Sequence, residues 1–279
     1  MPKNFLTPPE ICQAMIETGI YKAKNTALKQ LLLGLLGGLF IAFGAQANIT
    51  VLYSIDPGLA KLVGAAVFPV GLMLVILAGA ELFTGNNLIS LALLDDKISL
   101  NKLLKNWGIV YFANFAGAML FAFAIVKTNI LIPKGLKYVF SMADIKLQLS
   151  FSEAFYRGIC CNILVVLAVW LATGAVDFSS KMLACFFPVM LFVLSGFEHS
   201  IANMYYLSLA KLLGFNCSWQ AIIVNNLLPV TLGNIIGGAA IIPIIYYLAY
   251  GKTEKQQEQK LSLLPFMNYK NKHSLGKTC

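Results

Sequence analysis

Six blocks of apolar residues, separated by short polar connections, make up most of the chain. The blocks cover residues 28–53, 62–94, 107–132, 155–176, 182–213 and 221–250. Each block is long enough for the run of about 20 apolar residues with which an α-helix crosses about 30 Å of hydrocarbon. The pattern therefore predicts an all-α integral membrane protein with six transmembrane helices.

An amphipathic segment precedes the first block. Thr7 and Glu10 flank two prolines with the spacing of a capping box, which is a start signal for a helix. Met15 and Ile16 follow on one side of that helix. We expect a surface helix over about residues 7–25, lying at the membrane face.

Two of the apolar blocks are longer than a single crossing requires. Block 62–94 has 33 residues, and as a straight helix it would be about 50 Å long. Block 182–213 is similarly long. Glycine and polar residues lie in the middle of each block, at 79–87 and 195–203. We expect both the second and the fifth helix to be broken inside the membrane.

The two expected breaks repeat the same polar positions. A glycine is followed at the same spacing by Glu81 and Asn86 in the first break, and by Glu198 and Asn203 in the second. Hydrophobic bias alone does not produce matches between polar residues. The chain therefore contains a duplicated three-helix unit.

An odd number of crossings per unit places the second copy in the membrane upside down relative to the first. We expect the repeats over about residues 27–132 and 153–250, within a single transmembrane channel domain over residues 1–250. Inverted repeats whose helices are broken at matching places are typical of a transport path between the repeats. The pattern thus favours transport as the function.

Composition and charge add the orientation. The chain is 58% apolar and only 12% charged, which excludes a soluble globular domain, yet its formal net charge is +9. With six crossings both termini share one side, which carries 14 basic residues against 7 on the other. The positive-inside rule then places both termini, including a Lys-rich tail over residues 251–279, in the cytoplasm. The lysines are spread between apolar blocks, so we expect a lipid bilayer and no nucleic acid as a partner.

Three ionisable residues lie in the breaks, where the membrane makes charge expensive. They are Glu81, Glu198 and His199. The two glutamates match, which favours a structural role, because a carboxylate beside a helix break can accept hydrogen bonds from the freed backbone N–H groups. We assign Asn86 and Asn203 to the same structural group.

His199 has no copy in the first break, where Leu82 holds the matching position. A residue that is unique in a duplicated frame is a candidate for specialised chemistry, although a buried histidine also bonds a neighbouring carbonyl readily. Thr84, in the opposite break, could hydrogen-bond the imidazole or cap its own half-helix. Only two histidines occur in the chain, so we expect no metal site, no cofactor and no enzyme activity.

Apolar side chains surround these polar residues and would form the wall of a path. They are Phe68, Leu72, Leu82, Phe83, Val165 and Phe192. A permanent ion would lose its hydration in such a path, whereas a weak acid can cross as its neutral form. His199 is then the candidate proton donor to a passing anion. Asn162, an isolated amide in an apolar run, either bonds a neighbouring helix or lines the path.

Five motifs stand out in the sequence. The most specific is Phe-Glu-His-Ser-Ile-Ala-Asn-Met at residues 197–204, and the others lie at 79–86, 105–114, 157–162 and 225–234. Together they closely resemble the formate/nitrite transporter family, over about residues 5–250. The resemblance implies a homopentamer of aquaporin-like protomers. Each protomer would have its own pore for small monovalent anions such as formate, nitrite or hydrosulfide, with chloride as a further candidate.

By position, the resemblance also implies roles for individual residues. It makes Thr84 and His199 the central selectivity pair. It implies two constrictions, formed by Phe68 and Phe192 on one side and by Leu72, Leu82 and Phe83 on the other. Asn162 and Lys146 match positions that would help the anion at the outer mouth.

The first break differs from the pattern of formate channels. It has Glu81 followed by Gly85, Asn86 and Asn87, where formate channels tend to have Asp and then Ser-Thr. In this respect the chain looks most like the hydrosulfide channel branch of the family. We therefore expect a channel for hydrosulfide, with formate second, in a bacterial cytoplasmic membrane.

Two alternatives to this expectation remain. One is a formate or nitrite channel of the same family. The other is a neutral-solute channel of the aquaporin type, which would carry Asn-Pro-Ala boxes at the two breaks. In such a box a proline follows the asparagine directly, whereas here Asn87 follows Asn86 and Met204 follows Asn203. Neither break contains a proline.

Overall fold

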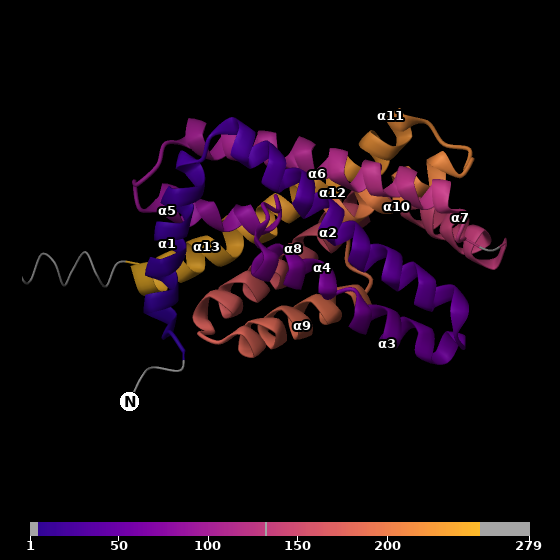
Figure 1. The fold of residues 1–279 in the computed structure, drawn as a ribbon. Coiled ribbons are helices and arrows are strands. Elements are labelled where there is room, and N and C mark those ends of the chain that lie inside the picture. The colour runs from indigo at the N-terminus through magenta and orange to yellow at the C-terminus, as the bar shows by residue number, and fades with distance from the viewer. Residues whose placement is uncertain (1–4, 132, 252–279) are drawn as a thin grey trace, which may run out of the picture.

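Long helices run side by side along one direction of the protein (Figure 1). The computed structural model describes residues 5–131 and 133–251. Among these residues, the helices long and apolar enough to cross a membrane are Ala27–Ser54, Pro57–Gly79, Leu100–Thr128, Phe151–Gly174 and Trp219–Gly251. Two shorter apolar helices, Gly85–Leu94 and Phe178–Leu194, accompany them. The protein is an all-helical membrane protein, as its hydrophobicity pattern predicts.

The second apolar block forms a broken helix. Its pieces are α3 (Pro57–Val67), α4 (Val70–Met73), the π-helical turn η1 (Leu74–Gly79), the 3-10 turn η2 (Gly85–Ile89) and α5 (Ser90–Leu94). Pro69, which has no backbone N–H, separates α3 from α4. Gly79 has a φ of 87°, which glycine adopts without strain, and it turns the chain out of the helix. The helix begins at Pro57, before the predicted start at residue 62. Lys61 interrupts the apolar run in the sequence, but it lies within α3, on the exposed surface of that helix.

The fifth apolar block is broken at the matching place. It consists of α9 (Phe178–Leu194) and α10 (Ser200–Leu212). Gly196, with a φ of 73°, turns the chain between them. Pro188 lies inside α9 without ending it. The predicted breaks of the second and fifth helices are therefore confirmed.

Two unbroken helices end the two repeats. They are α6 (Leu100–Thr128) in the first repeat and, in the second, the continuous segment of α11 (Trp219–Ala221), η3 (Ile222–Leu227), α12 (Leu228–Ile235), η4 (Ile236–Ile241), α13 (Ile242–Tyr246) and η5 (Tyr247–Gly251). Pro229 and Pro243 stand at the starts of α12 and α13. Each proline lacks an N–H and crowds the carbonyl four residues earlier, so a wider π-helical turn precedes it.

One helix lies where the sequence indicates only a polar connection. It is α7 (Pro133–Gln148), and it follows α6 and precedes the long helix α8 (Phe151–Gly174). Val139 and Ala143 are buried on its inner side. Its mixture of apolar and polar residues keeps its mean hydropathy low, which is why it does not stand out among the apolar blocks.

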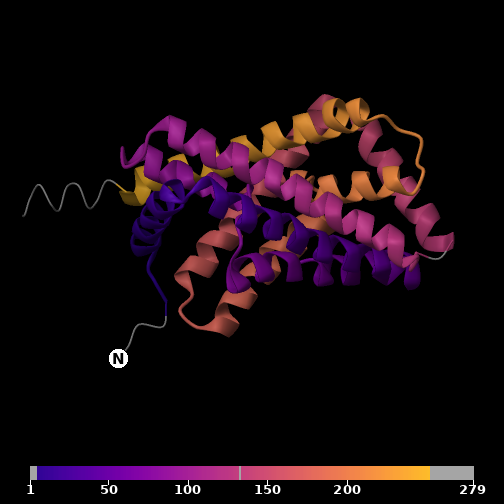
Figure 2. The ribbon, with the colours of Figure 1, turned by 45° about the horizontal axis from the view of Figure 1, so that its top comes forward.

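The first helix, α1 (Pro8–Lys24), crosses the ends of the long helices in both views (Figure 1, Figure 2). The Glu10 carboxylate accepts a hydrogen bond from Thr7 N at 2.8 Å, so the predicted capping box is present. The helix packs against α5, α8 and η5, and therefore both ends of the described chain lie at one end of the protein. The predicted Lys-rich tail falls outside the described residues, apart from Gly251.

Asn114 of α6 closes the first break. Its Nδ2 donates to Gly34 O of α2 (Ala27–Ser54) at 2.6 Å and to Glu81 O at 2.9 Å. Its Oδ1 accepts a hydrogen bond from Phe83 N at 2.9 Å. One buried amide thus satisfies two backbone groups that the broken helix leaves open, those of Glu81 and Phe83, and ties them to Gly34 of α2.

Asn234 closes the second break in the same way. Its Nδ2 donates to Gly158 O at 2.8 Å and to Glu198 O at 3.0 Å, and its Oδ1 accepts from Ser200 N at 3.0 Å. The partners occupy the same relative positions as in the first break. The duplication predicted from the polar positions therefore extends to the individual hydrogen bonds.

Candidate functional site

Thr84 and His199 meet at the centre of the protein, one from each break. Thr84 Oγ1 and His199 Nε2 are 2.8 Å apart, and both side chains are buried. Thr84 makes no side-chain cap bond to the helix that follows it. Of the two alternatives for Thr84, the structure therefore has the bond to the imidazole.

The tautomer of His199 follows from its other ring nitrogen. His199 Nδ1 accepts a hydrogen bond from Ala202 N at 3.1 Å and so caps α10. A nitrogen that accepts carries no proton, so in the neutral ring the proton is on Nε2. The Nε2–H then donates to Thr84 Oγ1, and the Thr84 hydroxyl remains a donor for a third group.

A small apolar chamber adjoins His199. It has a volume of about 10 Å³ and is lined by Ile41, Phe68, Leu72, Leu82, Val165, Val189, Phe192 and His199. The rings of Phe68 and Phe192 meet edge to face, with their centroids 5.7 Å apart, and Phe192 stacks on the imidazole. We call this space the central chamber. Ile41 and Val189 were not among the residues predicted for the path wall.

Phe83 lies elsewhere. Its ring packs against Trp107 and Tyr111 of α6, at centroid distances of 6.0 and 4.9 Å. It lines neither the central chamber nor the cavities on either side of it. The neighbouring residue Leu82 does line the chamber. A turn begins at Phe83 and its ring packs on α6, so Phe83 does not line the chamber with Leu82 as predicted.

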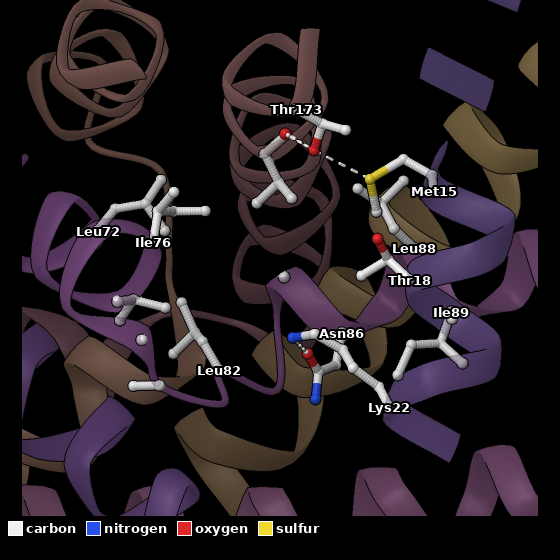
Figure 3. A pocket seen from close by; sticks show the side chains of 16 residues that line it. Met15, Thr18, Lys22, Leu72, Ile76, Leu82, Asn86, Leu88, Ile89 and Thr173 are labelled. Atoms are coloured by element: carbon white, nitrogen blue, oxygen red, sulfur yellow. Dashed lines mark hydrogen bonds between the residues drawn. The ribbon is translucent and has the colours of Figure 1, made fainter. Parts of the chain in front are cut away.

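A cavity of about 220 Å³ opens on the side of α1, and we call it the α1 mouth. Figure 3 shows Lys22 and Asn86 at its floor and Leu72 with Leu82 on its wall. These two leucines also line the central chamber. They therefore form the boundary between the mouth and the chamber.

A second cavity of about 120 Å³ opens on the side of α7, and we call it the α7 mouth. Lys146, Phe68, Phe192 and His199 are among the residues that line it. Phe68 and Phe192 are shared with the central chamber and form the boundary on this side. The arrangement is a path with two mouths, two apolar constrictions and one polar centre.

Each mouth holds a lysine bonded to the glutamate of the nearer break. Lys22 Nζ lies 3.2 Å from Glu81 Oε2, and Lys146 Nζ lies 2.9 Å from each oxygen of Glu198. Lys22 was not predicted. The duplication could have indicated it if the repeat had been extended to include the helix before each unit. In that longer repeat α1, before α2, matches α7, before α8.

The two glutamates differ from the expected hydrogen-bond pattern. Besides the lysines, their partners are the side-chain amides of Asn86 and Asn203, rather than the freed backbone N–H groups. Two of those N–H groups are already taken by Asn114 and Asn234.

Two further amides were missed. Asn86 Nδ2 also donates to Asn106 Oδ1 at 3.0 Å, and Asn203 Nδ2 donates to Asn226 Oδ1 at 2.8 Å. All four amides are buried. Each break therefore rests on a buried network of side chains.

Asn162 and Lys146 do not lie together at a mouth. Asn162 is fully buried, and its Nδ2 donates to Asn234 O at 2.7 Å, Asn87 Oδ1 at 3.0 Å and Thr84 O at 3.3 Å. Of the two alternatives for this amide, the structure has the bonds to neighbouring segments. Within the described ranges, no three His, Cys, Asp or Glu side chains come together to hold a metal ion.

Comparison with known proteins identifies the family. The family model described as Formate/nitrite transporter matches residues 9–248. The chain belongs to the formate/nitrite transporter family. It is a multi-pass membrane channel of that family and not an enzyme.

Curated relatives of the family cover most of this chain. It is 42% identical to the uncharacterized transporter YrhG of Bacillus subtilis, over 91% of this chain and 97% of that protein. It is 40% identical to the formate channel BtFdhC of Bacillus thuringiensis, over 89% and 97% respectively. It is 34% identical to the formate channel FocA of Escherichia coli, over 89% and 96%.

Solved structures of the family share the fold. One, described as an FNT family ion channel, has a TM-score of 0.81 at 28% identity and covers 86% of this chain and 98% of its own. Another, described as a pentameric formate channel with formate bound, has a TM-score of 0.72 at 33% identity and covers 80% and 97%. The architecture described above is therefore the fold of this family.

Proposed function

We propose that this protein conducts small monovalent anions of weak acids between the α1 mouth and the α7 mouth, with formate as the principal substrate. The observation that carries the proposal is the Thr84–His199 pair, held beside a closed apolar chamber between two mouths that each contain a lysine. Relatives that are named as formate channels support formate as the first candidate.

The geometry favours passage as the neutral acid. A lysine in each mouth attracts an anion, and the apolar chamber then disfavours its charge because no water replaces its hydration. The Thr84 hydroxyl is a donor beside the chamber, and its oxygen accepts from His199 Nε2–H. An anion that takes up a proton from the water of the entry mouth crosses beside this pair without its charge, and it returns the proton to water in the opposite mouth.

Hydrosulfide, which the sequence motifs favour over formate, is the second candidate here. The loop that carries Thr84 has Glu81, Asn86 and Asn87, and this departs from the usual formate-channel pattern. None of the relatives described above is named for hydrosulfide. Nitrite and chloride follow as further candidates from the name and chemistry of the family.

We propose a homopentamer in a bacterial cytoplasmic membrane, with both termini in the cytoplasm. One relative's structure is described as pentameric, which supports the assembly. Both ends of the described chain lie at one end of the protein, and the excess of lysines on that side supports the orientation. Both mouths and the chamber are lined by a single chain, so each protomer would have its own path.

The test is a flux assay with purified protein in proteoliposomes. Formate, hydrosulfide, nitrite, chloride and water are offered side by side, with protein-free liposomes as the control. We expect formate uptake without nucleotide, rising as the external pH falls. Uptake that required ATP or a sodium gradient would contradict the channel, and water flux without anion flux would indicate the neutral-solute alternative.

A further inference from the structure

The α7 mouth contains a hydrogen-bond donor that has no role in the path described so far. Asn48 of α2 lines this cavity together with Lys146 and His199, and only 5% of its surface is exposed. Its Oδ1 accepts a hydrogen bond from Tyr206 OH at 3.2 Å. No described residue accepts a hydrogen bond from its Nδ2, and that atom is not sealed from the cavity.

Two neighbours hold the amide of Asn48 in place. Tyr206 is buried, and its hydroxyl fixes the Oδ1 side of the amide. On the other side, a Cβ at Gly64 of α3 would lie 3.0 Å from Asn48 Nδ2, so the glycine leaves room for the NH₂ group. A buried amide with one side satisfied and one donor free is oriented toward a partner that the protein does not supply.

Lys146 is already engaged in the same cavity. Its ammonium group has three donors, and it contacts both oxygens of Glu198 at 2.9 Å. The carboxylate also neutralises much of its charge. An anion in the α7 mouth therefore finds a partly neutralised cation and needs a further donor to be held in one orientation.

We propose that Asn48 Nδ2 and Lys146 Nζ form a two-donor subsite for an oxyanion in the α7 mouth, and that Asn48 sets the preference for oxyanions over monatomic or thiol anions. The proposal rests on anion conduction as the function of the path. Formate and nitrite present two oxygen acceptors, whereas chloride and hydrosulfide present a single, weaker acceptor. The cavity of about 120 Å³ holds a three-atom anion with a few waters, since a space of about 10–15 Å³ on the same measure already holds one water.

The test compares Asn48→Leu with the unchanged protein in the same flux assay. Leucine has a similar size and no donor. With the anion supplied at the α7 mouth, we expect the half-saturating formate concentration to rise about three- to tenfold, as for the loss of one hydrogen bond. The half-saturating chloride and hydrosulfide concentrations change much less, so the ratio of formate to hydrosulfide flux falls.

Gln46→Leu is the matched control. Gln46 is the other buried amide on this part of α2, but its Oε1 accepts from Tyr205 OH and it does not line the mouth. We expect the flux ratio to stay unchanged in this variant. An equal loss for all anions in Asn48→Leu would overturn the proposal and indicate a packing role.

Tyr206→Phe gives a second, milder variant. It keeps Asn48 and removes only the hydroxyl that orients it. We expect a formate-selective change of about twofold, and an unchanged ratio would contradict the subsite even if Asn48→Leu fails to assemble. A wild-type protein that carried no anion would instead refute the proposed function itself.

Discussion

His199 uses its two ring nitrogens for different tasks. Nδ1 caps α10, which is a structural task, and Nε2 bonds Thr84 in the other break. Removal of the whole side chain therefore mixes a loss of stability with a loss of chemistry. A variant that keeps only one of the two bonds can separate them.

We expect His199→Asn to assemble normally and to change the pH dependence of formate flux. Asparagine is a good N-cap, so its side-chain oxygen can take over the bond from Ala202 N, but it cannot reach Thr84 as Nε2 does. His199→Ala lacks both bonds and should lose about 1 kcal/mol of folding stability as well. The measurements are flux against pH and thermal unfolding in detergent. A wild-type pH profile in His199→Asn would remove His199 from the mechanism.

At this scale the sequence predicts best where the duplication constrains the residue. Thr84 and His199 stand in opposite breaks of matching repeats, and this placed them near each other. Lys22 and Asn48 come from parts of the chain with no motif. Their role depends on which side chain of a helix faces a cavity, and this is set by packing between distant segments.

The broken helices are stable because side chains replace their missing backbone partners. Asn114 and Asn234 each bind three backbone groups from two segments. The carboxylates of Glu81 and Glu198 are bound separately, by lysines and amides. Each break therefore has its own buried hydrogen-bond network and is not a weak point in a helix.

We expect Asn114→Ala to destabilise the protein strongly. It leaves buried backbone groups of Gly34, Glu81 and Phe83 without this partner, at about 1–3 kcal/mol for each group left unsatisfied. The melting temperature in detergent should fall by several degrees. Asn101→Ala, at an exposed position of the same helix, is the control and should melt like the wild type. Equal melting temperatures for the two variants would show that the hydrogen bonds of Asn114 are dispensable for stability.

The elements themselves could be predicted from the sequence to different degrees. The length of the apolar blocks predicts the long helices, and the repeated Gly and Glu positions predict the breaks. The helix α7 was missed because only a narrow stripe around Val139 and Ala143 is buried, and polar residues interrupt its apolar positions. The extra length of α3 was missed because Lys61 was taken as the end of an apolar block.

Across the whole molecule, the path has similar charge arrangements at its two ends. Lys22 and Glu81 stand at the α1 mouth, and Lys146 and Glu198 at the α7 mouth. The lysines come from α1 and α7, which occupy matching places in the two repeats. In the proposed function, an anion therefore meets a comparable entrance from either side.

We expect each lysine to govern entry at its own mouth. Lys22→Met should raise the half-saturating formate concentration for entry at the α1 mouth, and Lys146→Met for entry at the α7 mouth, because each removes the local cation. Measurement requires proteoliposomes of known orientation. The paired variant Lys22→Met/Glu81→Gln is the control for the unpaired carboxylate that the single change leaves buried. Equal effects at both mouths would contradict local recruitment.

The central chamber has a further consequence for a cell that stores energy as a proton gradient. At about 10 Å³ it has room for about one water molecule at most, and His199 is the only polar residue of its lining, so a continuous file of water between the two mouths is disfavoured. Protons and hydrated ions then have no continuous chain of water to follow through the protein at rest. Passage of an anion the size of formate requires Phe68, Phe192, Leu72 or Leu82 to move aside. The membrane stays electrically insulated between these events.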